Sequence, residues 1–319
     1  MVISNQSPKK IILNSVLLSM FFSILFFPAY CSQGVIIGTK LFFNSLLPSI
    51  LPFLLFSNLV LYTGTSETLG KIFYPVTHSL FRCSYNGSYI IVLGFLCGFP
   101  VGSKILCDMY KKNKISSEEA HFIFSFINHA SPAFVINYIS IFCLENSKYR
   151  LILLILIYLP EITVGIIYSK KYPVFENIPA VNHTGSFISK SINMSVTNVI
   201  STLAKIGMYV VSFSIISNII KSLNFLNMRS RLFTISCLEL TSGISELSAS
   251  NISPDIKIFL CSFFTILCSV STLLQINYVI YDSSFSIKEL IKPKLLCIAI
   301  NILLFTLLHS CPFTRNILF

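Results

Sequence analysis

The stretch Gly94-Phe95-Leu96-Cys97-Gly98-Phe99-Pro100-Val101-Gly102-Ser103-Lys104 places three glycines and a proline inside an apolar run otherwise suited to a membrane-spanning helix. Both residue types weaken a helix interior, and proline also lacks a backbone N–H. Lipid offers no partner to the N–H and C=O groups that such a break frees, so a break persists only against protein or a water-filled cavity. The stretch therefore predicts a binding or transport site at membrane depth.

The composition predicts a membrane protein. Of 319 residues, 54% are hydrophobic and 11% are charged, whereas a soluble domain carries about 25% charged residues. A span takes roughly 20 residues, so the chain has room for about eight to ten crossing or re-entrant segments. We expect an all-α polytopic membrane protein with no separate soluble catalytic domain.

The formal charge of +11 does not indicate a nucleic-acid partner, because the basic residues are scattered over short loops. We interpret them as contacts to membrane lipid and as topology signals; with the N-terminus in the cytoplasm, most of them fall on the cytoplasmic side. Lys9 and Lys10 precede the apolar run 11–27 as in a signal peptide. Tyr30 does not suit a cleavage site, so we expect an uncleaved first helix.

Hydropathy predicts a series of helical segments, three of them interrupted. The chain divides at its most polar connection into an N-terminal helix and connection (1–40), a first repeat with its following helix (41–169), a linker (170–188), and a second repeat with the C-terminal helix (189–319). The predicted segments are 11–30, 41–62, 89–110, 121–144, 151–169, 192–220, 232–247, 258–281 and 295–309.

Both halves share one pattern, in which a segment rich in Gly, Pro, Ser or Thr lies between two long helices. The interrupted segments are 94–104 in the first half and 239–247 in the second. If both are re-entrant, the two halves enter the membrane from opposite sides, as in the inverted repeats of many secondary transporters. The pattern predicts two inverted repeats with one shared site.

Several blocks resemble the sporulation members of the nucleoside-recognition, or Gate-domain, membrane proteins. The resemblance covers roughly residues 40 to 310 and implies two inverted Gate-type repeats with interrupted helices. Two positions depart from the family pattern: Cys268-Ser269-Val270-Ser271, before Gln275, is usually glycine-rich, and Lys205 is usually apolar. The blocks are LLPSILPF at 46–53, GFLCGFPVGSK at 94–104, KIS at 114–116, EEA at 118–120, SFINHASP at 125–132, STL at 201–203, GMYVVSFS at 207–214 and LELTSGI at 238–244.

The resemblance also implies a function. Its sporulation members look like carriers that move dipicolinic acid, a small aromatic dicarboxylate, across the outer forespore membrane of a spore-forming bacterium. An anion that leaves water needs compensating charge. Interrupted helices supply part of it, because their N-termini expose N–H groups and a partial positive charge.

The expected binding residues follow from these breaks. Small residues allow the backbone to approach a solute, although they also suit tight helix packing. A lysine after the first break either pairs with a substrate carboxylate or reaches the interface, and Lys205 either binds the solute or pairs with Glu161 or Glu239. The predicted solute-binding residues are Gly98, Pro100, Gly102, Ser103, Lys104, Asn128, Ser131, Lys205, Thr241, Ser242 and Gly243.

Three further residues are candidates for coupling transport to protons: His129, Glu161 and Glu239. A histidine beside a proline kink is more often a packing residue. We expect no bond-making chemistry, because no Ser-His-Asp set, phosphate loop, dinucleotide fingerprint or metal-ligand cluster is present, and we expect no cofactor or metal. An intramembrane enzyme that uses these three residues, a nucleoside carrier and a non-transporting scaffold remain alternatives. A homo-oligomer is compatible with the sequence.

Overall fold

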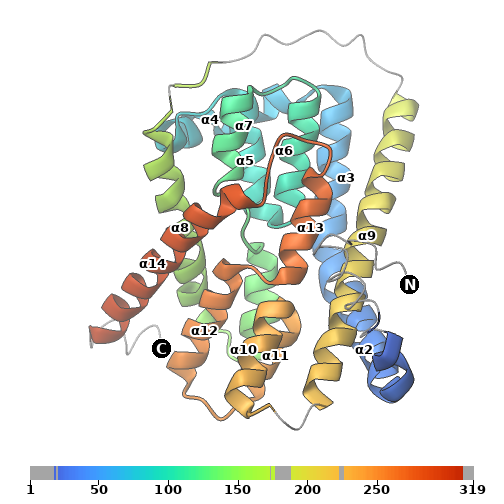
Figure 1. Ribbon diagram of the computed structural model, residues 1–319. Coiled ribbons are helices and arrows are strands. Elements are labelled where there is room, and N and C mark those ends of the chain that lie inside the picture. Colours follow the sequence, from blue (N-terminus) through green and yellow to red (C-terminus); the bar gives the residue numbers. More distant parts are fainter. Residues whose placement is uncertain (1–17, 19–20, 173, 177–187, 223–225, 312–319) are drawn as a thin grey trace, which may run out of the picture.

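The computed structural model describes residues 18, 21–172, 174–176, 188–222 and 226–311. Every regular element in these ranges is a helix, as the sequence predicts (Figure 1). The elements are α2 (Pro28–Leu41), the π-helix η1 (Phe42–Leu46), α3 (Leu47–Thr63), α4 (Ser66–Phe81), α5 (Tyr85–Cys97), α6 (Val101–Lys111), α7 (Ser117–Phe124), the π-helix η2 (Phe134–Cys143), α8 (Tyr149–Ser169), α9 (Ile188–Ser222), α10 (Met228–Leu238), α11 (Leu240–Ala249), α12 (Pro254–Leu267), α13 (Val270–Ile280) and α14 (Lys288–Ser310).

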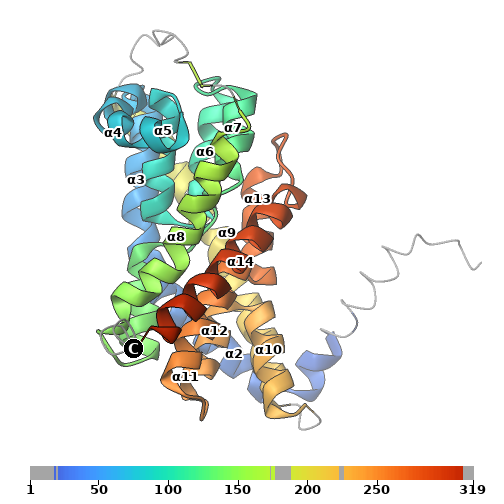
Figure 2. The ribbon, with the colours of Figure 1, turned by 90° about the vertical axis from the view of Figure 1, so that its left-hand side faces the viewer.

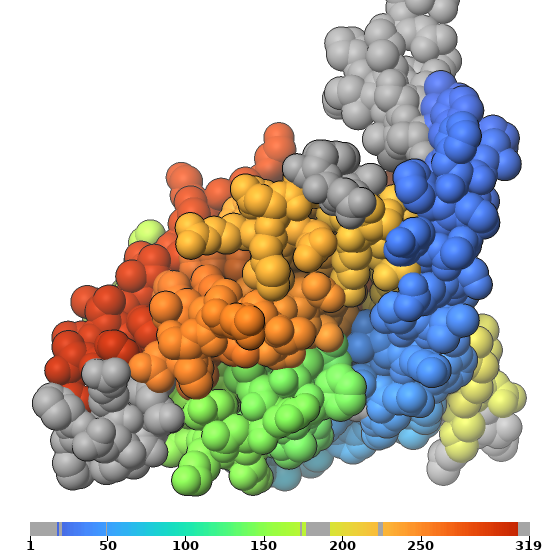
Figure 3. All heavy atoms as spheres, turned by 90° about the horizontal axis from the view of Figure 1, so that it is seen from below, coloured from blue at the N-terminus to red at the C-terminus, as the bar shows by residue number. Residues whose placement is uncertain are grey.

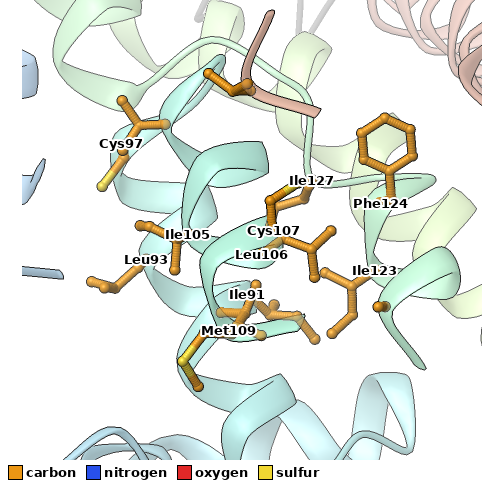
Figure 4. Close-up of a cluster of buried hydrophobic side chains, with 14 of the residues drawn as sticks. Ile91, Leu93, Cys97, Ile105, Leu106, Cys107, Met109, Ile123, Phe124 and Ile127 are labelled. Atoms are coloured by element: carbon orange, nitrogen blue, oxygen red, sulfur yellow. The ribbon is translucent and has the colours of Figure 1, made fainter. Parts of the chain in front are cut away.

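Helices α5 and α6 form a re-entrant hairpin that enters from the upper end in Figure 1 and turns at mid-depth. The two helices pack closely because Gly94 on α5 faces Gly102 on α6. A cluster of buried aliphatic side chains from α5, α6 and α7 surrounds the hairpin (Figure 4). Burial of such side chains against neighbouring helices fixes the hairpin in the protein interior.

Helices α10 and α11 form a second hairpin that enters from the opposite end (Figure 1). Gly243 on α11 lies against Ser236 on α10, where a Cβ would come 2.3 Å from the Ser236 Cα. Seen from below, the segment from α10 to α12 forms much of the lower surface, beside the turn that leads into α8 (Figure 3). The two interrupted segments are therefore re-entrant from opposite sides.

Each hairpin is followed by a broken span and then by an unbroken helix. In the first half α7 and η2 form the broken span and α8 the unbroken helix; in the second half these are α12–α13 and α14. Helices α8 and α14 pack against each other on one side of the molecule (Figure 2). The order of elements repeats with inverted direction, which is the arrangement that the sequence predicts.

Four described helices are long and apolar enough to cross a membrane: α8, α9, α14 and the broken helix Pro254–Ile280. Counting each bent helix pair as one span raises the number to six. In one of these pairs α4 meets α5 at 87° and lies across the upper end of the molecule (Figure 1). Hydropathy did not predict α4.

Several predicted boundaries are wrong. Segment 41–62 was predicted to begin a new helix at its first residue, but α2 continues through η1 to Leu46, and a 55° bend there leads into α3. Helix α14 begins at Lys288, seven residues before the predicted start of segment 295–309. Segment 258–281 was predicted to be continuous and is broken at Cys268. Residues 11–17, 19 and 20 of the predicted first helix and most of the linker 170–188 lie outside the described residues.

Candidate functional site

Four half-helices begin around one enclosed cavity at the centre of the molecule. They are α6 and α11, which follow the two hairpin tips, and η2 and α13, which follow the breaks in the two broken spans. Helix α9 and the η1–α3 segment complete the wall. The lining residues are Leu46, Ile50, Cys97, Phe99, Pro100, Ala130, Ser131, Phe134, Ile206, Val210, Glu239, Leu240, Thr241, Thr272 and Gln275.

The N-terminus of α11 is capped by a carboxylate from its own chain. Glu239 Oε2 accepts a hydrogen bond from the Ser242 N–H at 2.6 Å, and Oε1 accepts from the Thr241 N–H at 3.0 Å and from the Thr241 hydroxyl at 2.5 Å. Glu239 is 4% exposed. An anion at this place is favoured by the free N–H groups and by the helix dipole. Glu239 therefore shows how this helix end holds a carboxylate.

The N-terminus of α6 is held differently from that of α11. No side chain among the described residues caps it. Its tip is fixed through backbone instead, because the Phe99 N–H donates to the His129 carbonyl at 2.7 Å. Gly98 has φ +68°, and a Cβ there would lie 2.4 Å from the Ser131 backbone nitrogen. The first tip thus presents its helix N-terminus to the cavity without a competing acid.

The other two half-helices carry serine caps. Ser131 Oγ accepts from the Phe134 N–H at 3.2 Å, and Ser269 Oγ accepts from the Thr272 N–H at 3.2 Å. Gln275 lies one turn into α13 and donates to Ser271 Oγ at 3.2 Å. A few hydroxyl and amide groups therefore lie in a mostly apolar cavity wall, beside four partial positive helix ends.

The cavity has a volume of about 40 Å³. A cavity needs a volume of roughly 10–15 Å³ to hold one water molecule, so this cavity holds about three. Pockets for organic ligands have volumes of roughly 300–1,000 Å³. The cavity in this structure is therefore too small for an organic solute.

Only some of the predicted binding residues reach this cavity. Pro100, Ser131 and Thr241 line it, as does the predicted coupling residue Glu239. The others support the tips: Ser103 Oγ donates to Asn128 Oδ1 at 2.5 Å within the first repeat. The predicted residues that position the tips without lining the cavity are Gly98, Gly102, Ser103, Asn128, His129, Ser242 and Gly243.

Both predicted lysines lie outside the cavity lining. Lys104 Nζ is 2.5 Å from Asp108 Oδ1, one turn along α6. Lys205 is exposed on α9, with its Nζ 4.3 Å from the centre of the Tyr278 ring. The predicted pairing of Lys205 with Glu161 or Glu239 is wrong, because Glu161 contacts Lys294 and Glu239 caps α11.

Lys294 is buried on α14, although the basic residues were expected in short loops. Its side chain is 7% exposed and its Nζ lies 2.6 Å from Oε1 of Glu161, which is fully buried. Sequence analysis also missed Phe99, Thr272 and Gln275 in the cavity wall. Ser269, Thr272 and Gln275 follow one another at intervals of three positions, so their polar side chains share one helix face. This pattern could have identified Thr272 and Gln275 from the sequence.

This fold defines the class of protein: an all-α polytopic integral membrane protein whose two re-entrant hairpins meet at a central cavity. The chain is similar to the sporulation integral membrane protein YlbJ of Bacillus subtilis (strain 168), with 23% identity over 304 aligned residues that cover 86% of this chain and 74% of that protein. The alignment therefore relates the chain, at a distance, to a sporulation integral membrane protein. No family model and no solved structure matches it.

Proposed function

We propose that this protein carries a small anionic solute across the membrane through the cavity between its hairpin tips. The observation that supports the proposal is the convergence of four half-helix N-termini on one buried cavity. Each N-terminus contributes a partial positive charge, and the α6 end has no side-chain cap, so together they offset part of the cost of taking a carboxylate out of water. Opposed re-entrant hairpins are also the framework in which transporters expose one site alternately to the two sides.

Dipicolinic acid is the leading substrate, with transport across the outer forespore membrane. Its two carboxylates suit two helix ends on opposite sides of the cavity. The α6 end is uncapped, and the α11 end holds the Glu239 carboxylate in the position that a substrate carboxylate would take. A substrate with two carboxylates therefore binds at α11 when the Glu239 side chain moves away.

A nucleoside carrier is the second candidate, and the cavity lining favours it in one respect. The lining contains Glu239 but no lysine or arginine among the described residues. A carboxylate together with Thr241, Thr272 and Gln275 suits the hydroxyl groups of a neutral solute. The family resemblance and the four helix N-termini favour the anion.

Uptake of labelled dipicolinate into vesicles that contain the purified protein tests the proposal. We expect uptake above that of empty vesicles, and we expect the solute to be recovered unchanged. Gln275→Ala removes a lining amide and is expected to lower uptake about tenfold, as for a lost hydrogen bond to a charged group. Lys104→Ala and Lys205→Ala are the controls, since both residues lie outside the lining.

The outcomes separate the candidates. Loss of uptake in Gln275→Ala with both lysine variants unchanged supports the cavity as the path. Uptake of a labelled nucleoside without uptake of dipicolinate would show that the substrate is a neutral nucleoside and not the anion. Folded protein that moves neither solute contradicts the carrier, and recovery of a chemically altered solute would favour an intramembrane enzyme.

A further inference from the structure

A fully buried ion pair lies beside the break between α7 and η2, outside the cavity lining. Lys294 on α14 contacts Glu161 on α8, and the side chains are 7% and 0% exposed. The same Lys294 Nζ donates to the backbone carbonyl of Asn128, within the break. Cys297 Sγ donates to the other carboxylate oxygen of Glu161 at 3.3 Å. Lys294 therefore joins α14 of the second repeat to two elements of the first.

One oxygen that this ammonium contacts, the Asn128 carbonyl, is of the kind that binds a metal cation in broken-helix transporters. There, backbone carbonyls of the unwound segment and the C-terminal ends of half-helices coordinate Na⁺. Asn128 follows the C-terminal end of α7, which carries a partial negative charge, and Glu161 adds a full negative charge. Without a cation, these buried oxygens would be strongly destabilising.

We propose that the Lys294 ammonium is a built-in cation that fills a monovalent cation site formed by the Asn128 carbonyl and the Glu161 carboxylate. The protein therefore needs no free Na⁺ at this position. The transport consequence, that uptake does not depend on Na⁺, rests on the proposed function. The site itself does not, because cation binding can be measured on protein that transports nothing.

Thermal unfolding of the purified protein in lipid nanodiscs tests the site. A dye that reacts with newly exposed thiols is a suitable probe, because the chain has no tryptophan and most of its cysteines are buried. The protein and its Lys294→Ala variant are compared in choline chloride and in increasing NaCl at constant ionic strength. The shortened side chain leaves room for an ion beside Asn128 and Glu161.

We expect the unfolding midpoint of the unaltered protein to be the same in both salts. Lys294→Ala should unfold about 10 °C lower in choline, as expected when a buried charge loses its partner. Added Na⁺ should restore most of this loss in a saturable way. The double variant Lys294→Ala with Glu161→Ala lacks the carboxylate and should not respond to Na⁺.

Lys257→Ala is a matched control, because Lys257 Nζ also donates to a backbone carbonyl, that of Ser248, away from this break. It should show no response to Na⁺. The proposal is overturned if Lys294→Ala is equally unstable in both salts, or if the unaltered protein itself is saturably stabilised by Na⁺. Should Lys294→Ala not fold, Lys294→Ser removes the same charge, leaves similar room for an ion and carries the same expectation.

Discussion

The hairpins α5–α6 and α10–α11 have the same topology but are built differently. Most of α5 is buried, whereas few residues of α10 are, and Phe233 on α10 is 58% exposed. The first tip is fixed by backbone contact between Phe99 and His129, and the second by the side chain of Glu239. An element with fewer buried contacts opens at lower free energy. The comparison indicates that the first hairpin is the fixed wall of the cavity and the second is the more readily displaced.

The tip of the first hairpin should be the least tolerant position. Gly98→Ala adds a Cβ 2.4 Å from the Ser131 nitrogen at a φ of +68°, so we expect a loss of about 3 kcal/mol or more in the free energy of unfolding. Gly64→Ala is the matched control, because Gly64 has φ +76° with no atom within 4 Å of the new Cβ. It should cost about 1 kcal/mol. Equal losses in denaturant unfolding would show that the tip contact does not constrain the fold.

The packing within each hairpin can be compared directly. Gly243→Ala places a Cβ 2.3 Å from the Ser236 Cα, whereas Gly102→Ala places one 3.1 Å from the Gly94 Cα. Overpacking of this kind costs roughly 1–3 kcal/mol, and we expect the larger value at Gly243. Thermal unfolding of the two variants measures the difference. If Gly102→Ala proves the more damaging, the second hairpin accommodates strain by moving, which would sharpen the proposed division of roles.

The cap of the second hairpin should have the smallest effect on stability and a distinct effect on transport. Glu239→Gln removes a negative charge from the cavity wall while retaining one amide oxygen as acceptor for the α11 N–H groups. For an anionic solute the KM should fall about tenfold, since about 1.4 kcal/mol of repulsion is removed.

Glu246→Gln on the same helix is the control for this substitution. Glu246 pairs with Lys221 and does not line the cavity, so the KM of the Glu246→Gln variant should equal that of the unaltered protein. For a neutral solute bound through the Glu239 carboxylate, KM should rise instead. The sign of the change in KM therefore decides between the two candidate substrates.

Helix breaks that occur at glycine or proline residues could be predicted from the sequence. The Gly98–Pro100 tip and the break before Pro132 carry these residues, and the stretch Thr241–Gly243 marks the second tip. The break at Cys268 could not be predicted, because Cys268 adopts φ +61° in a position where glycine is expected. The only sign of this break in the sequence was that residues 268–271 lack the glycines usual in the similar family.

The ion pair and α4 escaped prediction for other physical reasons. Lys294 and Glu161 are 133 positions apart, and their contact depends on how α8 and α14 pack. Hydropathy places a lysine near a helix start at the membrane surface, and it cannot show that a buried acid lies opposite. Helix α4 lies across the upper end, so its apolar face is too short and too mixed to register as a span.

Because the two repeats run in opposite directions, the conformation of each repeat also describes a second conformation for the other. For a carrier, the first repeat in the conformation of the second, and the second in that of the first, would describe the same chain open to the other side. The differences between the hairpins then measure how unequal the two states are in free energy. In such a carrier, identical hairpins would make the two states equally populated, whereas the contacts of Glu239 and Gly98 in this chain would favour one of them.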